Sequence, residues 1–201
     1  METVRNNVIF EKQKTMSNYN SEEKQILLKI ADEAIKFGLE KHRALPIKLE
    51  DYPENLRTNG ASFVTLEINK QLRGCIGTLE AYQPLIQDIA QNAYAAAFRD
   101  PRFLPLTAEE YLNLSKHISI LSKPVKMSFT SEEDLLKQIR PGVDGLILAD
   151  RGYRGTFLPS VWESLPQPEL FLQHLKLKAG LPDNHWSETL TVEKYTVEMV
   201  E

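Results

Sequence analysis

Hydrophobic positions recur with helical spacing in two long stretches of the chain. In residues 21–40 apolar side chains return every three or four positions, and Asn20 and Glu23 stand at the spacing of a capping box. A second apolar stretch starts behind Pro84, which suits the first turn of a helix, and ends near Phe98. The pattern predicts one helix from about residue 21 to about residue 40 and another up to Phe98.

An alternating pattern near the start of the folded part predicts a β-hairpin. Two β-rich runs are separated by the pair Asn69-Lys70, the length of a two-residue hairpin turn. With that turn, Leu66 faces Arg73 and Val64 faces Cys75. Because side chains alternate along a strand, we expect Arg73 and Cys75 to share one face with these two apolar residues.

The rest of the chain is predicted as short strands and helices. In residues 116–122, His117 falls on the face opposite Ile118 and Ile120. The other expected strands are residues 145–149, 153–158 and 190–200, and helices are expected behind Thr107 and Ser131 and from Pro168 to a closing Gly180.

The two predicted hairpins have a similar pattern. Arg73-Gly74 and Arg154-Gly155 both lie in a returning strand that precedes a helix, about 80 residues apart. This spacing favours an α+β fold in which duplicated halves share one antiparallel sheet. Coincidence of composition is the alternative interpretation, since an Arg-Gly step after a turn is common.

Length and composition set the broad class. We expect residues 1–20 to be a flexible N-terminal tail and residues 21–201 to form a single domain of two intimately packed subdomains. No apolar run approaches the roughly 20 residues that span a bilayer, and residues 1–20 lack the apolar core of a secretion signal. A single cysteine excludes an internal disulfide, and we expect a cytoplasmic protein. The formal net charge of −4 disfavours nucleic acid as a partner.

Cys75, with Arg73 beside it, is the candidate catalytic group. A nearby guanidinium favours the thiolate form, which is the nucleophile. A small buried hydrophobic residue is the competing interpretation, because free cysteine is among the most buried residue types. None of the four histidines lies in a motif that points to Cys75, and no spacing of ligands predicts a metal site.

Several further residues are candidate ligand-binding groups. Gly74 and Gly77 let a ligand approach the backbone, and we expect Arg99, Asp100 and Arg102 to form an anion-binding or ion-pairing corner. The alternative interpretation is structural: Asp100 holds Arg102 or another arginine in place. Arg154 enters as the counterpart of Arg73 in the second hairpin. An arginine on an apolar face needs partners for its donors, and Asp100 is the carboxylate we expect beside Arg73.

The segment Leu72-Arg73-Gly74-Cys75-Ile76-Gly77 resembles the signature of the AMMECR domain family, whose prokaryotic members are called AmmeMemoRadiSam system protein A. The resemblance continues through residues 95–103, 118–122 and 140–146, and it covers about residues 24–200. It implies an α+β fold with a larger and a smaller subdomain around a mostly antiparallel, internally duplicated sheet. It also implies a functional site where the signature borders a cleft between the subdomains.

The resemblance implies association with Memo-like and radical-SAM proteins but no particular reaction or cofactor. Two positions depart from the family pattern: Lys176 stands where many relatives have cysteine, and Ser160 where glutamine is frequent. The first departure argues against a two-cysteine metal or redox mechanism. Two functions follow as hypotheses: a small-ligand-binding or catalytic cleft around residues 72–77, and a non-catalytic adaptor for partner proteins.

Overall fold

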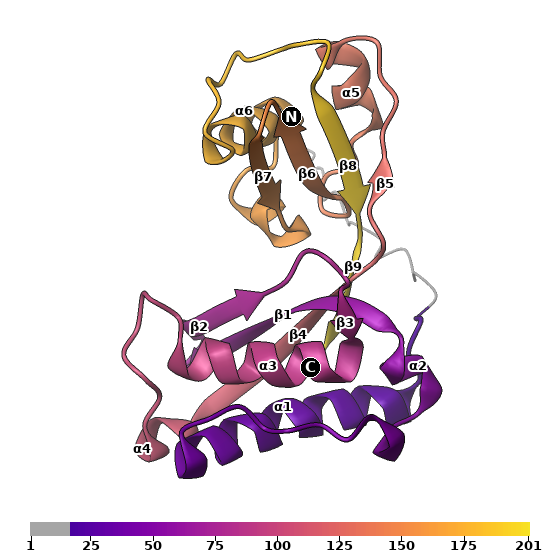
Figure 1. The fold of residues 1–201 in the computed structure, drawn as a ribbon. Coiled ribbons are helices and arrows are strands. Elements are labelled where there is room, and N and C mark those ends of the chain that lie inside the picture. Colours follow the sequence, from indigo (N-terminus) through magenta and orange to yellow (C-terminus); the bar gives the residue numbers. More distant parts are fainter. Residues whose placement is uncertain (1–16) are drawn as a thin grey trace, which may run out of the picture.

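Two antiparallel sheets organise residues 17–201, the part of the chain that the computed structural model describes (Figure 1). The first sheet has the order β2-β1-β4-β9, with β3 paired to the start of β1. The second sheet has the order β5-β8-β6-β7. The strands are β1 (Asn59–Ile68), β2 (Gln71–Gly77), β3 (Gln83–Pro84), β4 (Leu114–Leu121), β5 (Val125–Lys126), β6 (Gly145–Asp150), β7 (Tyr153–Phe157), β8 (Thr191–Tyr195) and β9 (Val197–Val200).

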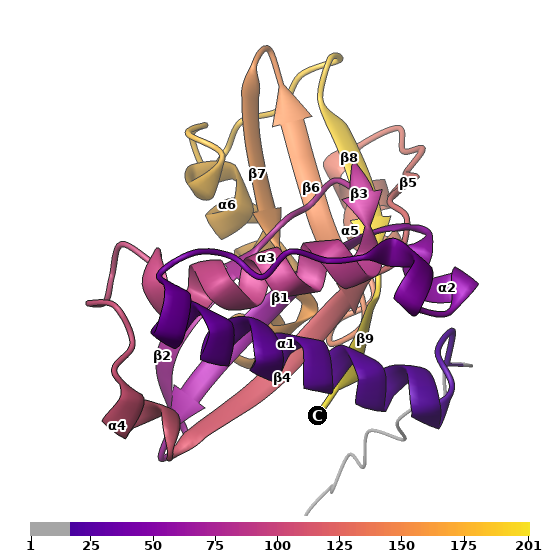
Figure 2. The same cartoon turned by 60° about the horizontal axis from the view of Figure 1, so that its bottom comes forward.

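The two long predicted helices pack together on one face of the first sheet (Figure 2). These are α1 (Ser21–Lys41) and α3 (Leu85–Phe98), and their apolar sides form one core with β1 and β4. The expected capping box closes the start of α1, where Asn20 accepts from the Glu23 amide and the Glu23 carboxylate accepts from the Asn20 amide. The short helices of this part are α2 (Glu54–Arg57), α4 (Ala108–Tyr111) and a 3-10 turn at Leu49–Asp51.

A buried carboxylate in α3 ties that helix to the end of the first hairpin. Asp88 accepts hydrogen bonds from the hydroxyls of Ser62 and Thr78, both at 2.7 Å, and from the Asn92 amide at 2.9 Å. Buried polar groups need hydrogen-bond partners, and these donors satisfy both oxygens of the Asp88 carboxylate without a cation. The contacts fix the strand end that follows Gly77 against the helix layer.

The second sheet has its own helices and its own core. Its helices are α5 (Glu132–Gln138), α6 (Pro168–Lys178) and a 3-10 turn at Pro159–Glu163. The Trp162 ring stacks on the Phe171 ring with centroids 3.7 Å apart, and apolar residues of α6, β6 and β8 surround the pair. We call residues 125–195 the small subdomain, and residues 17–121 with 197–201 the large subdomain.

The chain passes between the subdomains at two adjacent points. Ser122 follows β4 and Thr196 separates β8 from β9, and the Ser122 amide donates to the Thr196 carbonyl at 2.9 Å. The Thr196 amide donates to the Ser122 hydroxyl at the same distance. The predicted single strand over residues 190–200 is therefore wrong, because the chain changes sheets at Thr196. The α+β class is confirmed, but the expected single sheet is two sheets.

A third hydrophobic cluster joins the two subdomains beside these crossings. Its buried members are Ala61 and Leu121 from the first sheet and Ile147 and Tyr195 from the second. Partly buried apolar residues, including Phe63, extend the cluster over the adjoining face of the first sheet. The small subdomain thus covers one end of the sheet face that lies opposite α1 and α3.

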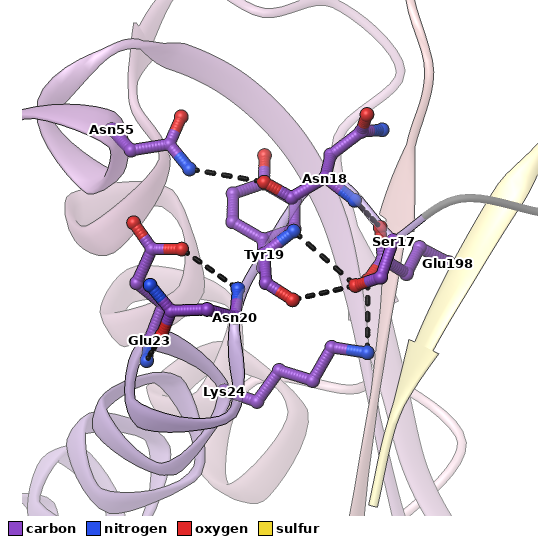
Figure 3. Close-up of polar contacts among 8 residues, drawn as sticks. All are labelled: Ser17, Asn18, Tyr19, Asn20, Glu23, Lys24, Asn55 and Glu198. Atoms are coloured by element: carbon purple, nitrogen blue, oxygen red, sulfur yellow. Dashed lines mark hydrogen bonds and ion pairs between the residues drawn. The ribbon is translucent and has the colours of Figure 1, made fainter.

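Residues 17–20 are held against β9 (Figure 3). The Ser17 hydroxyl and the Asn18 amide donate to the Glu198 carboxylate, and Lys24 forms an ion pair with it at 3.0 Å. Within the predicted tail of residues 1–20, Ser17 and Asn18 thus have hydrogen-bond partners on β9. Residues 1–16 of the predicted tail lie outside the described part. Within residues 17–201, no helix is both long and apolar enough to cross a membrane.

Candidate functional site

A β-bulge in the first hairpin decides which way the signature residues point. Asn69 and Lys70 both have positive φ angles and form the predicted two-residue turn. The register then shifts, because Leu66 pairs with Gly74 and one residue of β2, Arg73, is left without a partner on β1. The expected pairing of Arg73 with Leu66 is therefore wrong.

The bulge places Cys75 on the sheet face opposite the helices. A Cβ on Gly74 would lie 2.1 Å from the Ala96 carbonyl oxygen, so Gly74 faces α3. Cys75, the next residue, faces the other way and pairs with Thr65 rather than with Val64. Its half-buried thiol lies 3.3 Å from the Thr65 hydroxyl. The prediction that Val64 and Leu66 surround the thiol is therefore wrong, and its neighbour on β1 is the polar Thr65.

A histidine lies on the same face, one strand beyond Thr65. Thr65 pairs with Cys75 on one side and with His117 of β4 on the other, so the three side chains form a row across three strands. The His117 Nε2 atom is 3.4 Å from the Glu67 carboxylate. Sequence reasoning placed His117 opposite Ile118 correctly but missed this row, because the bulge moves Cys75 to that face.

The predicted corner at Asp100 and Arg102 covers the outer edge of β2. Asp100 accepts from the Cys75 amide at 2.9 Å and binds the Arg102 guanidinium through both carboxylate oxygens, at 2.9 and 2.7 Å. The Arg102 Nη2 atom also donates to the Cys75 carbonyl at 3.3 Å. The guanidinium and the two amides that donate to Asp100 lower the pKa of its carboxyl.

Arg73 binds a different carboxylate from the one expected. Its Nε and Nη2 atoms donate to Glu110 of α4 at 2.8 and 2.9 Å, and Nη2 also donates to the Leu104 carbonyl. The Arg73 guanidinium, helped by the Thr107 amide, lowers the pKa of Glu110 to about 2. The predicted pairing of Arg73 with Asp100 is wrong because the bulge turns Arg73 toward α4. Arg73 ties α4 and the preceding loop to β2.

The remaining candidate residues take part in packing and in a surface ion pair. A Cβ on Gly77 would lie 2.2 Å from the Phe63 ring, so the lack of a side chain at this position leaves room for the ring. Arg154 of the small subdomain donates to Glu80, just behind the signature, at 2.6 Å. Both partners are largely exposed, and the pair links the subdomains beside the site.

Comparison with known proteins identifies the family. A model of the AMMECR1 family matches residues 28–200. The chain belongs to the AMMECR1 family. This confirms the resemblance that begins at the signature.

Relatives of this AMMECR1-family chain occur in archaea. A protein from Methanocaldococcus jannaschii is 37% identical over 163 residues, covering 77% of this chain and 79% of the relative. One from Methanothermobacter thermautotrophicus is 40% identical over 167 residues, covering 80% and 84%. The crystal structure of an uncharacterized protein from Pyrococcus horikoshii, 34% identical, aligns with a TM-score of 0.78 over 86% of this chain and 88% of that chain.

Three features outside the row bear on the chemistry of this AMMECR1-family chain. Lys176 is buried and forms an ion pair with Glu132 at 2.8 Å, so its charge has a structural partner. Among residues 17–201, no group of three or more His, Cys, Asp or Glu side chains could hold a metal ion. A surface cavity of about 540 Å³ is lined by residues 17–21, Glu23 and Lys24, and one of about 280 Å³ by residues around the β6–β7 turn. Neither is lined by the signature.

Proposed function

We propose that this AMMECR1-family protein binds a small molecule on the face of the first sheet that α1 and α3 leave uncovered, with Cys75 as the group that contacts or attacks it. The observation that carries the proposal is the row Cys75–Thr65–His117, contributed by three adjacent strands. Strands hold side chains in more fixed positions than loops do, which suits a binding or catalytic site.

The spacing of the row limits how its members act together. Neighbouring strands lie about 4.8 Å apart, so Cys75 and His117 are separated by roughly 10 Å along the sheet. A proton therefore does not pass directly between them. The Thr65 hydroxyl is within reach of the thiol. His117 is placed to contact the far end of a ligand lying across Thr65, and Glu67 orients its ring.

A non-catalytic adaptor is the second candidate function, and an exposed apolar surface favours it. Leu104 and Leu112 are 84% and 79% exposed, and Leu72 is also exposed. Leu72 precedes Arg73 in the chain, Leu112 comes two residues after Glu110, and the Leu104 carbonyl accepts a hydrogen bond from Arg73. Exposed apolar patches mark protein contact sites, and the family resemblance suggests Memo-like or radical-SAM proteins as partners.

Native mass spectrometry of the purified protein tests the ligand-binding function. We expect a small molecule to be retained by the wild type and lost in the Thr65→Val and His117→Ala variants, which remove polar groups from the row. The matched control, Leu104→Ser with Leu112→Ser, changes the apolar surface and should retain the molecule. Identical spectra for the wild type and the row variants would contradict the proposal. If another protein co-purifies with the wild type and is lost only from the leucine variant, the adaptor function is favoured.

A further inference from the structure

We infer that Arg102 makes the Cys75 site selective for ligands with an anionic group, such as a carboxylate. The inference rests on the proposed function, since it names the class of ligand for that site. It assigns Arg102 a binding role beyond its contacts with the edge of β2.

Asp100 fixes the orientation of the Arg102 guanidinium, although the Arg102 side chain is half exposed. Its Nε and Nη2 atoms are held by both oxygens of Asp100, whose side chain is only 2% exposed. Asp100 is fixed in turn by the amides of Cys75 and Arg102. A bidentate pair anchored on backbone amides removes most of the rotational freedom that a free arginine keeps.

The outer side of this guanidinium is available to a ligand. The Arg102 side chain is 52% exposed, and within residues 17–201 its Nη1 atom has no hydrogen-bond partner. The contact of Nη2 with the Cys75 carbonyl places the group beside the residue that carries the thiol. Arginine differs from lysine in offering planar, directed donors that match a carboxylate. An anion bound at Nη1 would therefore lie close to the thiol.

Arg73, the arginine expected in this role, is not suited to it. Glu110 and the Leu104 carbonyl occupy its Nε and Nη2 donors, and its Nη1 atom is buried. Arg102 and Arg73 lie near the same Phe103 ring, at 5.5 and 5.6 Å from its centroid. The Arg102 side chain is 52% exposed, whereas the Arg73 side chain is only 11% exposed. The ligand-facing charge beside Cys75 thus comes from Arg102.

Alkylation of Cys75 by two reagents of nearly equal size tests the inference on the whole folded protein. Iodoacetate carries a carboxylate and iodoacetamide a neutral amide. With either, an S–CH2 bond forms, the C–I bond breaks, iodide leaves with the bonding electrons and the thiol proton passes to solvent. The measured quantity is the ratio of the iodoacetate rate to the iodoacetamide rate, with the urea-unfolded chain as reference.

We expect the folded wild type to show a ratio about fivefold above that of the unfolded chain, since two unit charges about 4 Å apart in water attract by roughly 1 kcal/mol. The double variant Asp100→Asn with Arg102→Gln removes one charge of each sign and leaves no buried carboxylate unpaired. Its ratio should fall to the unfolded value. Any change in the reactivity of the thiol itself affects both reagents equally and cancels in this ratio. Arg99→Gln is the matched control, because this exposed arginine lies against Tyr94, and its ratio should remain raised.

A second measurement needs no variant. The wild-type ratio should fall toward the unfolded value as sodium chloride is raised to 0.5 M, because salt screens a charge at an exposed site. A folded thiol that reacts with both reagents at the unfolded ratio would overturn the role of Arg102 and leave the proposed site standing. A thiol that reacts with neither reagent while the protein is folded would overturn both.

Discussion

Gly74 shows at the scale of a single residue why the signature contains a glycine before the cysteine. The strand approaches α3 so closely that a Cβ here would lie 2.1 Å from the Ala96 carbonyl oxygen. Gly155 has the equivalent place in the second hairpin, where a Cβ would lie 2.9 Å from the Ala179 nitrogen. Each glycine pairs with a buried leucine of the preceding strand, Leu66 and Leu148 respectively. This local likeness supports the predicted repeat of the hairpins.

We expect Gly74→Ala to lower the free energy of unfolding by about 2 to 3 kcal/mol, because the backbone of α3 has to move. Gly155→Ala should cost less, about 1 kcal/mol, since its overlap is smaller. Urea denaturation of the two variants against the wild type measures the difference. If the two variants lose equal free energy of unfolding, or if Gly74→Ala loses none, α3 moves to admit the methyl group without strain.

Single residues also mark the limit of sequence reasoning at this site. The turn at Asn69-Lys70 was predictable because its length and residue types are local properties. The bulge at Arg73 was not, because it depends on Gly74 meeting α3 and on Arg73 reaching Glu110. A shift of one residue moves each following side chain to the other face, so the surroundings of Cys75 were predicted wrongly.

At the scale of elements, the Arg73–Glu110 pair joins β2 to α4 and gives that junction a dependence on pH. The folded state holds the pKa of Glu110 at about 2, below the value of about 4.3 expected in the unfolded chain. The pair therefore stabilises the fold above pH ~4.3 and loses this contribution as the pH falls toward 2.

We predict that the urea midpoint of Glu110→Gln falls less between pH 5 and pH 2.5 than that of the wild type. The variant lacks the carboxylate whose protonation weakens the pair, although Asp100 still contributes in the same direction. Urea titrations at the two pH values measure the loss for each protein. Parallel losses in both proteins would show that Glu110 does not contribute to acid unfolding.

Elements with local start signals were predictable and those that depend on distant partners were not. The capping boxes at Asn20 and Thr107 are read from four consecutive residues, and both form. The division of residues 190–200 between two sheets has no such signal, because the interruption of the alternating pattern, at Glu193-Lys194, lies inside β8 and not at Thr196. The two segments have different partners far away in the sequence, since β8 pairs with β6 and β9 pairs with β4.

At the scale of the whole molecule, we expect the two subdomains to unfold together as one domain. Extensive packing between elements lies within each subdomain, but the cluster that includes Ala61 and Ile147 belongs to both. The two tryptophans, Trp162 and Trp186, both lie in the small subdomain. Their fluorescence therefore reports that part, whereas far-ultraviolet circular dichroism reports both.

Thermal unfolding followed by the two signals should give coincident transitions, as a cooperative two-state unit does. Ile147→Ala weakens the shared cluster and should separate them, with Leu135→Ala, inside the small core, as the control that lowers stability without separating them. Two separate transitions in the wild type would show that the subdomains are independent folding units.

The double crossing at Ser122 and Thr196 has a consequence for the chain while it is being made. β4 leaves the ribosome before any residue of the small subdomain, but its partner β9 follows only after the last of them. At roughly 5 to 20 residues per second, the nascent first sheet keeps an unpaired edge at β4 for several seconds. Unpaired edges invite association with other chains. The interval before β9 emerges is thus when a growing chain is most exposed to aggregation, and when a chaperone that covers a strand edge would protect it best.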